Sequence, residues 1–248
     1  MRIGNRNFSP KFWPSLATLL LLPALIALGL WQLDRADQKR TYYEVLVKRQ
    51  TKATININQD NARINSDEML WRKVYAKGHF DEDVQILLDN QIMKNQVGYY
   101  VFTPFKLAEH DTWFLVNRGW VGVGNDRDQL PAFNRTKNLV SISGTAMNVP
   151  ARGIQLGEII DETPAPGVYR LQAIDIAHIS KLTGIQFMPY IIRLNPDSQY
   201  GYARAWEMPD SGEDVHLAYA FQWFLLAITL LIIYIMVNLE KVQDSENI

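Results

Sequence analysis

The sequence predicts an α+β membrane protein, in which one transmembrane helix near each end flanks a mainly antiparallel β domain with one or two helices. Three observations support this fold class. Residues 12–33 carry no charge, and neither do residues 215–239. Each run exceeds the roughly 20 apolar residues that cross a bilayer. Between them, short stretches of alternating β-branched and aromatic residues are typical of strands.

The first span follows three basic residues, Arg2, Arg6 and Lys11. A cleaved signal peptide also begins this way, but the apolar run is too long and no small-residue cleavage site follows it. We therefore expect an uncleaved anchor. The positive-inside rule places residues 1–11 in the cytoplasm, and the second span returns residues 240–248 to the same side. Residues 34–214 then form a periplasmic, β-rich domain of a multi-pass protein in a bacterial inner membrane.

The outer domain begins with a helical extension of the first span over residues 42–52. Ile55 and Ile57 then alternate with polar residues as in a strand. One helix is expected around residues 176–182, ending at Gly184. The strands should form a barrel or a sandwich. Further strands are expected at residues 74–80, 84–88, 98–105, 113–117, 140–147, 169–173 and 187–194.

The composition excludes several kinds of chemistry. The chain has no cysteine, so it has no disulfide, thiolate metal ligand or cysteine nucleophile. The absence of cysteine also fits a periplasmic domain. A net charge of -1 without a basic patch argues against a nucleic-acid partner. The four histidines lack metal-ligand spacing, and no catalytic motif is present. We therefore predict no catalytic residues, no metal site and no enzymatic activity.

One short motif in the outer domain contains Asn117, Arg118 and Gly119, at the end of an expected strand. Arg118 has two possible roles. It could form a salt bridge or a stacking contact beside a turn glycine, or it could contact a partner protein.

The second span carries polar side chains on one face. His216, Tyr219 and Trp223 follow i, i+3, i+7 spacing, and His216 lies where the helix enters the membrane from outside. Polar residues within a membrane normally face another helix. We expect the spans to pack near their outer ends and to bring Gln32 toward Gln222. A histidine in the headgroup layer beside two paired glutamines would account for these residues without any ligand.

Gly29 lies about one turn before Gln32 on the first span. Glycine permits close approach between two membrane helices. The expected contact between the spans should therefore include this position.

Four segments together resemble the Surfeit locus protein one family, and the resemblance covers nearly the whole chain. The first includes Trp31, Gln32 and Arg35 at the exit of the first span. Their order and their placement against two spans carry the resemblance. The four segments are Gly29–Arg35, Gly98–Phe105, Val116–Val121 and His216–Phe224.

The resemblance implies a non-enzymatic assembly factor for haem-copper cytochrome c oxidase that assists the catalytic subunit. Some bacterial members are thought to bind haem a through the histidine that matches His216, which would make this residue an axial ligand beside Tyr219 and Trp223. Arg118 or Arg204 would then be available to the propionates. Haem A synthase is a further partner that this role implies. The partner or structural candidates are Trp31, Gln32, Arg35, Asn117, Arg118, Gly119 and Gln222.

Two other functions stay open beside this one: a membrane-tethered periplasmic interaction module, or an enzyme of unknown substrate. A sensor is disfavoured, because the cytoplasmic ends are too short for a signalling domain. The sequence also departs from the family at residues 122–126, where many members carry basic or proline-rich residues. We therefore do not transfer to this loop any partner contact that it makes in other family members.

Overall fold

The computed structural model describes residues 2–3, 6–60, 66–124, 127, 129–150 and 161–241. Residues 125 and 126 of the loop noted above lie outside this description. The chain divides into two compact units. One unit comprises residues 1–45 and 209–248, and the other comprises residues 46–208.

The first unit is built on two long helices, α1 (Phe12–Thr51) and α5 (Glu213–Val237). Both are long and apolar enough to cross a membrane. The expected helical extension of the first span is confirmed, because α1 continues without a break to Thr51. Pro23 lies inside α1, within the span. Proline is tolerated there because neighbouring groups satisfy the carbonyl that loses its partner.

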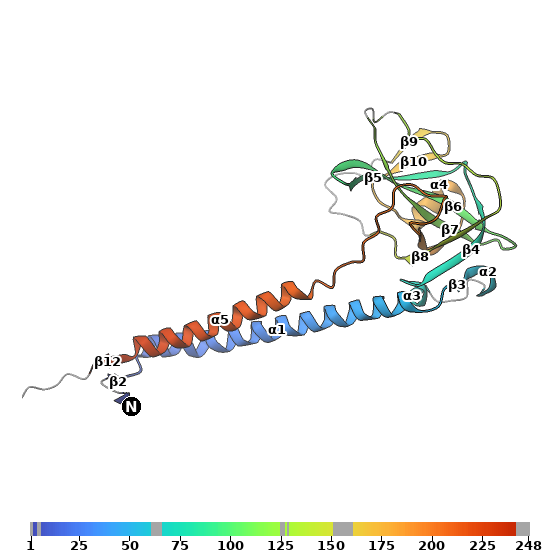
Figure 1. Ribbon diagram of the computed structural model, residues 1–248. Coiled ribbons are helices and arrows are strands. Elements are labelled where there is room, and N and C mark those ends of the chain that lie inside the picture. The colour runs from blue at the N-terminus through green and yellow to red at the C-terminus, as the bar shows by residue number, and fades with distance from the viewer. Residues whose placement is uncertain are drawn as a thin grey trace, which may run out of the picture. The chain divides into compact units, whose positions relative to one another are not determined.

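The two helices lie side by side and antiparallel (Figure 1). Toward the chain ends, the hydroxyls of Ser15 and Tyr234 are 3.1 Å apart. Gly29 packs directly against Phe224, since a Cβ added at the glycine would lie 2.6 Å from the ring. The predicted close approach of the spans at Gly29 is therefore confirmed.

A small three-stranded sheet, which was not predicted from the sequence, joins the chain ends. β2 (Arg6–Phe8) pairs antiparallel with both β1 (Arg2–Ile3) and β12 (Leu239–Lys241). Asn238, which is fully buried, reinforces the junction. Its Oδ1 accepts a hydrogen bond from the Lys11 N–H at 2.6 Å, and its Nδ2 donates to the Tyr234 carbonyl at 2.7 Å.

The second unit is a β-barrel with additional strands. Its barrel strands follow the order β4-β8-β11-β7-β6, and a pairing between β4 and β6 closes the ring. Of the two expected architectures, the structure therefore has the barrel. The elements of this unit are β3 (Ile55–Asn56), α2 (Ile57–Asp60), α3 (Ser66–Met69), β4 (Lys73–Phe80), β5 (Gln85–Met93), β6 (Gln96–Leu107), β7 (Trp113–Gly122), β8 (Val140–Met147), β9 (Glu162–Ala165), β10 (Val168–Leu171), α4 (Ile176–Thr183) and β11 (Phe187–Leu194).

The strands pair mainly antiparallel, as predicted, but not throughout. β3 pairs in parallel with β4, β10 with β5, and β11 with β7. The strand predictions for β8 and β11 match the observed bounds. Ile57 begins α2 instead of continuing a strand, so that part of the prediction was wrong. Both Ile55 and Ile57 are buried, which explains why their alternation resembled a strand.

The predicted strand end at Asn117 was also wrong, because β7 continues to Gly122. The pairing of β7 with β6 shifts register here, and Gly119 adopts a φ of +115°. A β-bulge of this kind inserts one extra residue into a strand, and a glycine with positive φ allows the strand to continue beyond it. Arg118 therefore lies within the strand.

The core is apolar on both sides of the barrel wall. One buried cluster includes Phe105, Phe114 and Ile192 from three barrel strands. Another includes Ile179 of α4, which is fully buried. This helix ends at Gly184 with a φ of 71°, as its sequence predicts.

Candidate functional site

His216 and Gln32 form a direct polar contact between the two membrane helices. The imidazole Nδ1 lies 2.8 Å from the amide oxygen Oε1 of Gln32. Gln32 is 9% exposed, so its amide faces α5. An amide oxygen can only accept, so Nδ1 carries the hydrogen and donates it. The lone pair on Nε2 is then left for a further ligand or donor.

The expected pairing of Gln32 with Gln222 was therefore wrong, because His216 occupies that place. Six residues separate positions 216 and 222, which turns a helix by about 240° beyond a full revolution. Gln222 consequently points to another side of α5, where it is exposed. The His216–Gln32 contact confirms that the spans meet near the ends that adjoin residues 34–214.

Two aromatic residues follow His216 along α5. Tyr219 is half exposed. Trp223 has a buried indole Nε1 with no hydrogen-bond partner among the described residues. A buried N–H without an acceptor costs about 1–3 kcal/mol. This orphaned donor fits a site that receives an acceptor from a bound molecule or from a neighbouring protein.

Trp31 and Arg35 lie on the outer surface of α1. The Arg35 guanidinium stacks over the Trp31 ring at 5.9 Å and donates to Gln38 at 2.9 Å. Trp31 is 51% exposed. Trp31 and Arg35 are thus accessible to lipid or to a partner.

Further along α1, Arg40 forms an ion pair of 2.7 Å with Glu213 at the start of α5. This hydrogen bond raises the pKa of the arginine.

Arg118 is buried inside the barrel domain and belongs to an internal network. Its guanidinium forms an ion pair with Glu82, with a nitrogen–oxygen distance of 3.1 Å, and the two side chains are 1% and 2% exposed. Glu82 also accepts from the amide of Gln85 at 3.2 Å, and Thr103 donates to Gln85 at 2.7 Å. Of the two roles considered for Arg118, the salt bridge therefore fits the geometry.

The same guanidinium holds two long loops. It donates to the carbonyl of Tyr200 at 2.7 Å and to that of Asn134 at 2.6 Å. It also stacks over Tyr202 at 5.4 Å. Arg204 is likewise occupied, by the carbonyls of Asn195 and Ser198. The expectation that Arg118 or Arg204 meets a ligand's propionates stays a prediction, although both guanidiniums donate to internal carbonyls.

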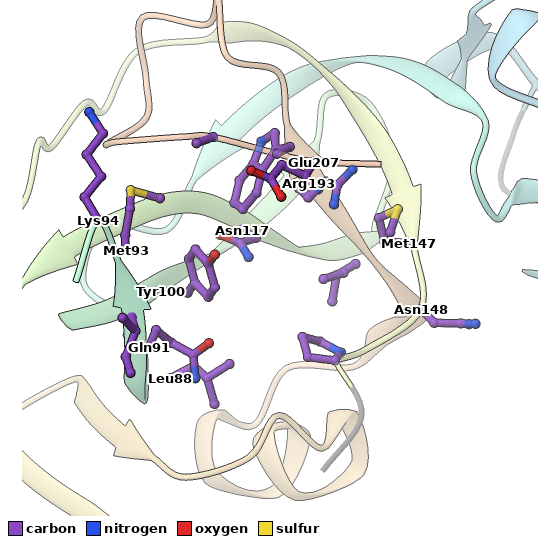
Figure 2. Close-up of a pocket in the computed structure, with 15 residues that line it drawn as sticks. Leu88, Gln91, Met93, Lys94, Tyr100, Asn117, Met147, Asn148, Arg193 and Glu207 are labelled. Atoms are coloured by element: carbon purple, nitrogen blue, oxygen red, sulfur yellow. The ribbon is translucent and has the colours of Figure 1, made fainter. Parts of the chain in front are cut away.

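Asn117 and Gly119 shape the strand around Arg118. The side-chain oxygen of Asn117 accepts from the Gly119 N–H at 3.0 Å. A Cβ at Gly119 would lie 2.7 Å from the carbonyl oxygen of Ala203. Asn117 also lines a cavity of about 660 Å³ in the barrel domain (Figure 2), which the sequence analysis missed. Among the described residues, no group of three histidine, aspartate or glutamate side chains could hold a metal ion.

The fold and the site define a class of protein: a membrane-anchored β-barrel protein with a histidine held between its two spans. The chain belongs to the SURF1 family, which matches residues 19–228. The family resemblance seen in the four segments is therefore confirmed.

The chain has relatives in bacteria and in eukaryotes. A SURF1-like protein of Rickettsia bellii is 29% identical over 88% of this chain and 88% of its own length. One from Rickettsia felis is 27% identical over 89% of this chain and 95% of its own. The yeast cytochrome oxidase assembly protein SHY1 is 25% identical over 47% of this chain and 30% of its own.

Proposed function

We propose that this protein is a non-enzymatic assembly factor for haem-copper cytochrome c oxidase. Membership of the SURF1 family and the oxidase-assembly role that the yeast relative's name states support the proposal. The partners we propose are the catalytic subunit of the oxidase and haem A synthase. The location we propose is a bacterial inner membrane, with both chain ends in the cytoplasm.

The finer proposal is that His216 binds haem a as an axial ligand while the cofactor is delivered as cargo. The observation that carries it is the hydrogen bond from His216 Nδ1 to Gln32. Ligating histidines characteristically donate their other ring N–H to a carbonyl or carboxylate, which fixes the tautomer and raises the basicity of the ligating nitrogen. Haem iron accepts neutral imidazole readily.

Each residue of the site has a distinct proposed role. Gln32 holds the imidazole as the tautomer with a free Nε2, and Nε2 binds the iron. Tyr219 and Trp223 supply apolar surface for the ring, and the orphaned indole N–H of Trp223 offers a hydrogen bond to an oxygen of the cargo. The bound haem would itself supply redox chemistry only after transfer to the oxidase.

Absorption spectroscopy tests haem binding. The protein is co-expressed with the enzymes that make haem a and then purified. We expect a haem spectrum that His216→Ala abolishes. The matched control is His79→Ala, because His79 is exposed on β4 in the other unit. A preparation without haem, or an unchanged spectrum in folded His216→Ala protein, would refute ligation by His216.

A deletion strain tests the assembly role separately. Loss of the gene should lower the amount of assembled oxidase without abolishing synthesis of its subunits. The wild-type gene should restore the oxidase spectrum. Normal oxidase levels in a deletion strain that has no paralogue would overturn the assembly proposal, whatever the result of the haem experiment.

Reporter fusions test the proposed orientation. Alkaline phosphatase is active only outside the cytoplasm, so a fusion after Asn138 should be active and one at the C-terminus should not. The opposite pattern would overturn the N-in, C-in topology.

A further inference from the structure

The barrel domain contains a cavity of about 660 Å³ that the proposed function does not use. Its walls come from the β5–β6 hairpin, from β7, β8 and β11, and from the segment that follows β11 (Figure 2). Apolar and aromatic side chains make up much of the lining, including Leu88, Met93, Tyr100, Met147, Ile191 and Trp206. Cavities of about 300–1,000 Å³ with such walls are typical small-molecule sites.

Arg193 lines this cavity and is held there by aromatic rings. Its guanidinium lies 5.1 Å from the ring centre of Trp206 and 5.9 Å from that of Trp71. Trp206 is itself fixed, because its indole N–H donates to the Leu194 carbonyl at 2.7 Å and its ring packs on Tyr100 at 5.5 Å. Stacked in this way, the guanidinium is pre-oriented and its N–H edges remain available.

The Arg193 charge has no anionic partner within the described part of the chain. No hydrogen bond or ion pair of its guanidinium is found there, although the side chain is half-buried. Burial lowers the pKa of Arg193, and no carboxylate offsets this effect. Arg118 shows the usual arrangement, since Glu82 and several carbonyls satisfy it. Partly buried charges are normally paired because desolvation is costly.

The rest of the lining favours an anion that also has an apolar part. Lys94, at the tip of the β5–β6 hairpin, adds a second positive charge. Glu207 also lines the cavity but forms no ion pair with Arg193 among the described residues. The two methionines, Met93 and Met147, supply flexible, polarisable surface that adapts to varied ligands.

We propose that this cavity binds a small amphipathic carboxylate, with the carboxylate on Arg193 and an apolar or aromatic body against Tyr100, Trp206 and the methionines. A guanidinium matches a carboxylate through two parallel N–H···O bonds. The cavity is formed by residues of the second unit, whereas His216 belongs to the first. Ligand binding here would be a function additional to oxidase assembly.

Calorimetry with a matched pair of probes tests the proposal. The full-length protein in non-ionic detergent is titrated with 4-phenylbutanoate and with the neutral 4-phenylbutanamide, and titrations into detergent alone are subtracted. We expect saturable 1:1 binding of the carboxylate, with the amide weaker by about tenfold or more because it cannot form the charge-assisted pair. Equal affinities, or no binding of the carboxylate up to about 10 mM, a generous limit for a ligand of this size, would overturn the proposal.

Three variants sharpen the test. Arg193→Gln should reduce the affinity for the carboxylate to that for the amide. Lys73→Gln removes an equivalent charge from the exposed surface of β4, outside the cavity, and should leave both affinities unchanged. Glu207→Gln removes a competing negative charge and should strengthen binding of the carboxylate. An unaltered preference for the carboxylate in folded Arg193→Gln protein would assign recognition to another group and refute the role of Arg193.

Discussion

The imidazole Nδ1 of His216 lies 2.8 Å from the side-chain oxygen of Gln32, which is 184 residues earlier in the chain. This contact sets the tautomer of the histidine and fixes the rotation of α5 about its axis relative to α1. It therefore links the proposed ligand chemistry to the packing of the spans.

Gln32→Leu should reduce haem occupancy about 10- to 100-fold, because loss of the hydrogen-bond acceptor releases the imidazole. The matched control is Gln222→Leu, since that glutamine is exposed on another side of α5. The ratio of haem to purified protein measures both. Equal occupancy in the two variants would show that Gln32 does not position the ligand.

Crosslinking checks the register of the spans directly, because the native chain has no cysteine. Cysteines introduced at positions 32 and 216 should form a disulfide in membranes. Cysteines at positions 32 and 222 should not, because the second site points away. Efficient crosslinking of the second pair alone would mean that α5 is rotated from the observed register.

Gly29→Leu should force the spans apart, since even a Cβ at this position would lie 2.6 Å from the Phe224 ring. The crosslinking yield between positions 32 and 216 should fall. Phe224→Ala in the same chain should restore the yield by making room. Ala27→Leu adds the same side chain on the exposed face of α1 and should have no effect. A failure of Phe224→Ala to rescue would locate the clash elsewhere.

Arg118→Met should destabilise the barrel domain by about 3–5 kcal/mol, because it leaves Glu82 buried without its counter-charge. Adding Glu82→Gln should recover part of this loss. Lys106→Met removes the exposed ion pair with Asp111 and should cost less than about 1 kcal/mol. Urea denaturation followed by tryptophan fluorescence measures all three. Similar losses for the two ion pairs would contradict the structural role of Arg118.

Alkaline pH should weaken the barrel domain through Tyr190, whose pKa burial raises to about 12. The folded state then holds the phenolic proton more tightly than the unfolded chain does, so its contribution is complete below pH 10 and is lost as the pH rises toward 12. Between pH 8 and pH 11 the loss should be about 1–1.5 kcal/mol. Tyr190→Phe should show a correspondingly smaller decline, and an identical decline would contradict the shift.

The sequence was sufficient for features that depend on local pattern. The apolar runs define α1 and α5, and Gly184 marks the end of α4, because length and capping are local properties. The choice of His216 over Gln222 as the partner of Gln32 was not predictable from depth alone, since depth does not give the rotation of a helix. The residues around Arg118 likewise do not indicate that its partner is Glu82, which lies 36 residues earlier in the chain.

The cavity around Arg193 could not be predicted from the sequence for a related reason. Its lining comes from strands and loops between Leu88 and Glu207, and closure of the barrel brings them together. Nothing in the immediate neighbourhood of Arg193 indicates that Trp71 and Trp206 enclose it.

The joining of β2 to β12 has a consequence for biosynthesis. Residues 6–8 of β2 pair with residues 239–241 of β12, so this pairing cannot form until residue 241 has been made. At about 5–20 residues per second, a ribosome needs roughly 10–40 s to reach the second span after completing the first. During that interval α1 sits in the bilayer with the amide of Gln32 facing no helix of its own chain. The nascent protein therefore passes through a stage in which the amide of Gln32 has to bond to water, to lipid headgroups or to another membrane protein instead of to His216.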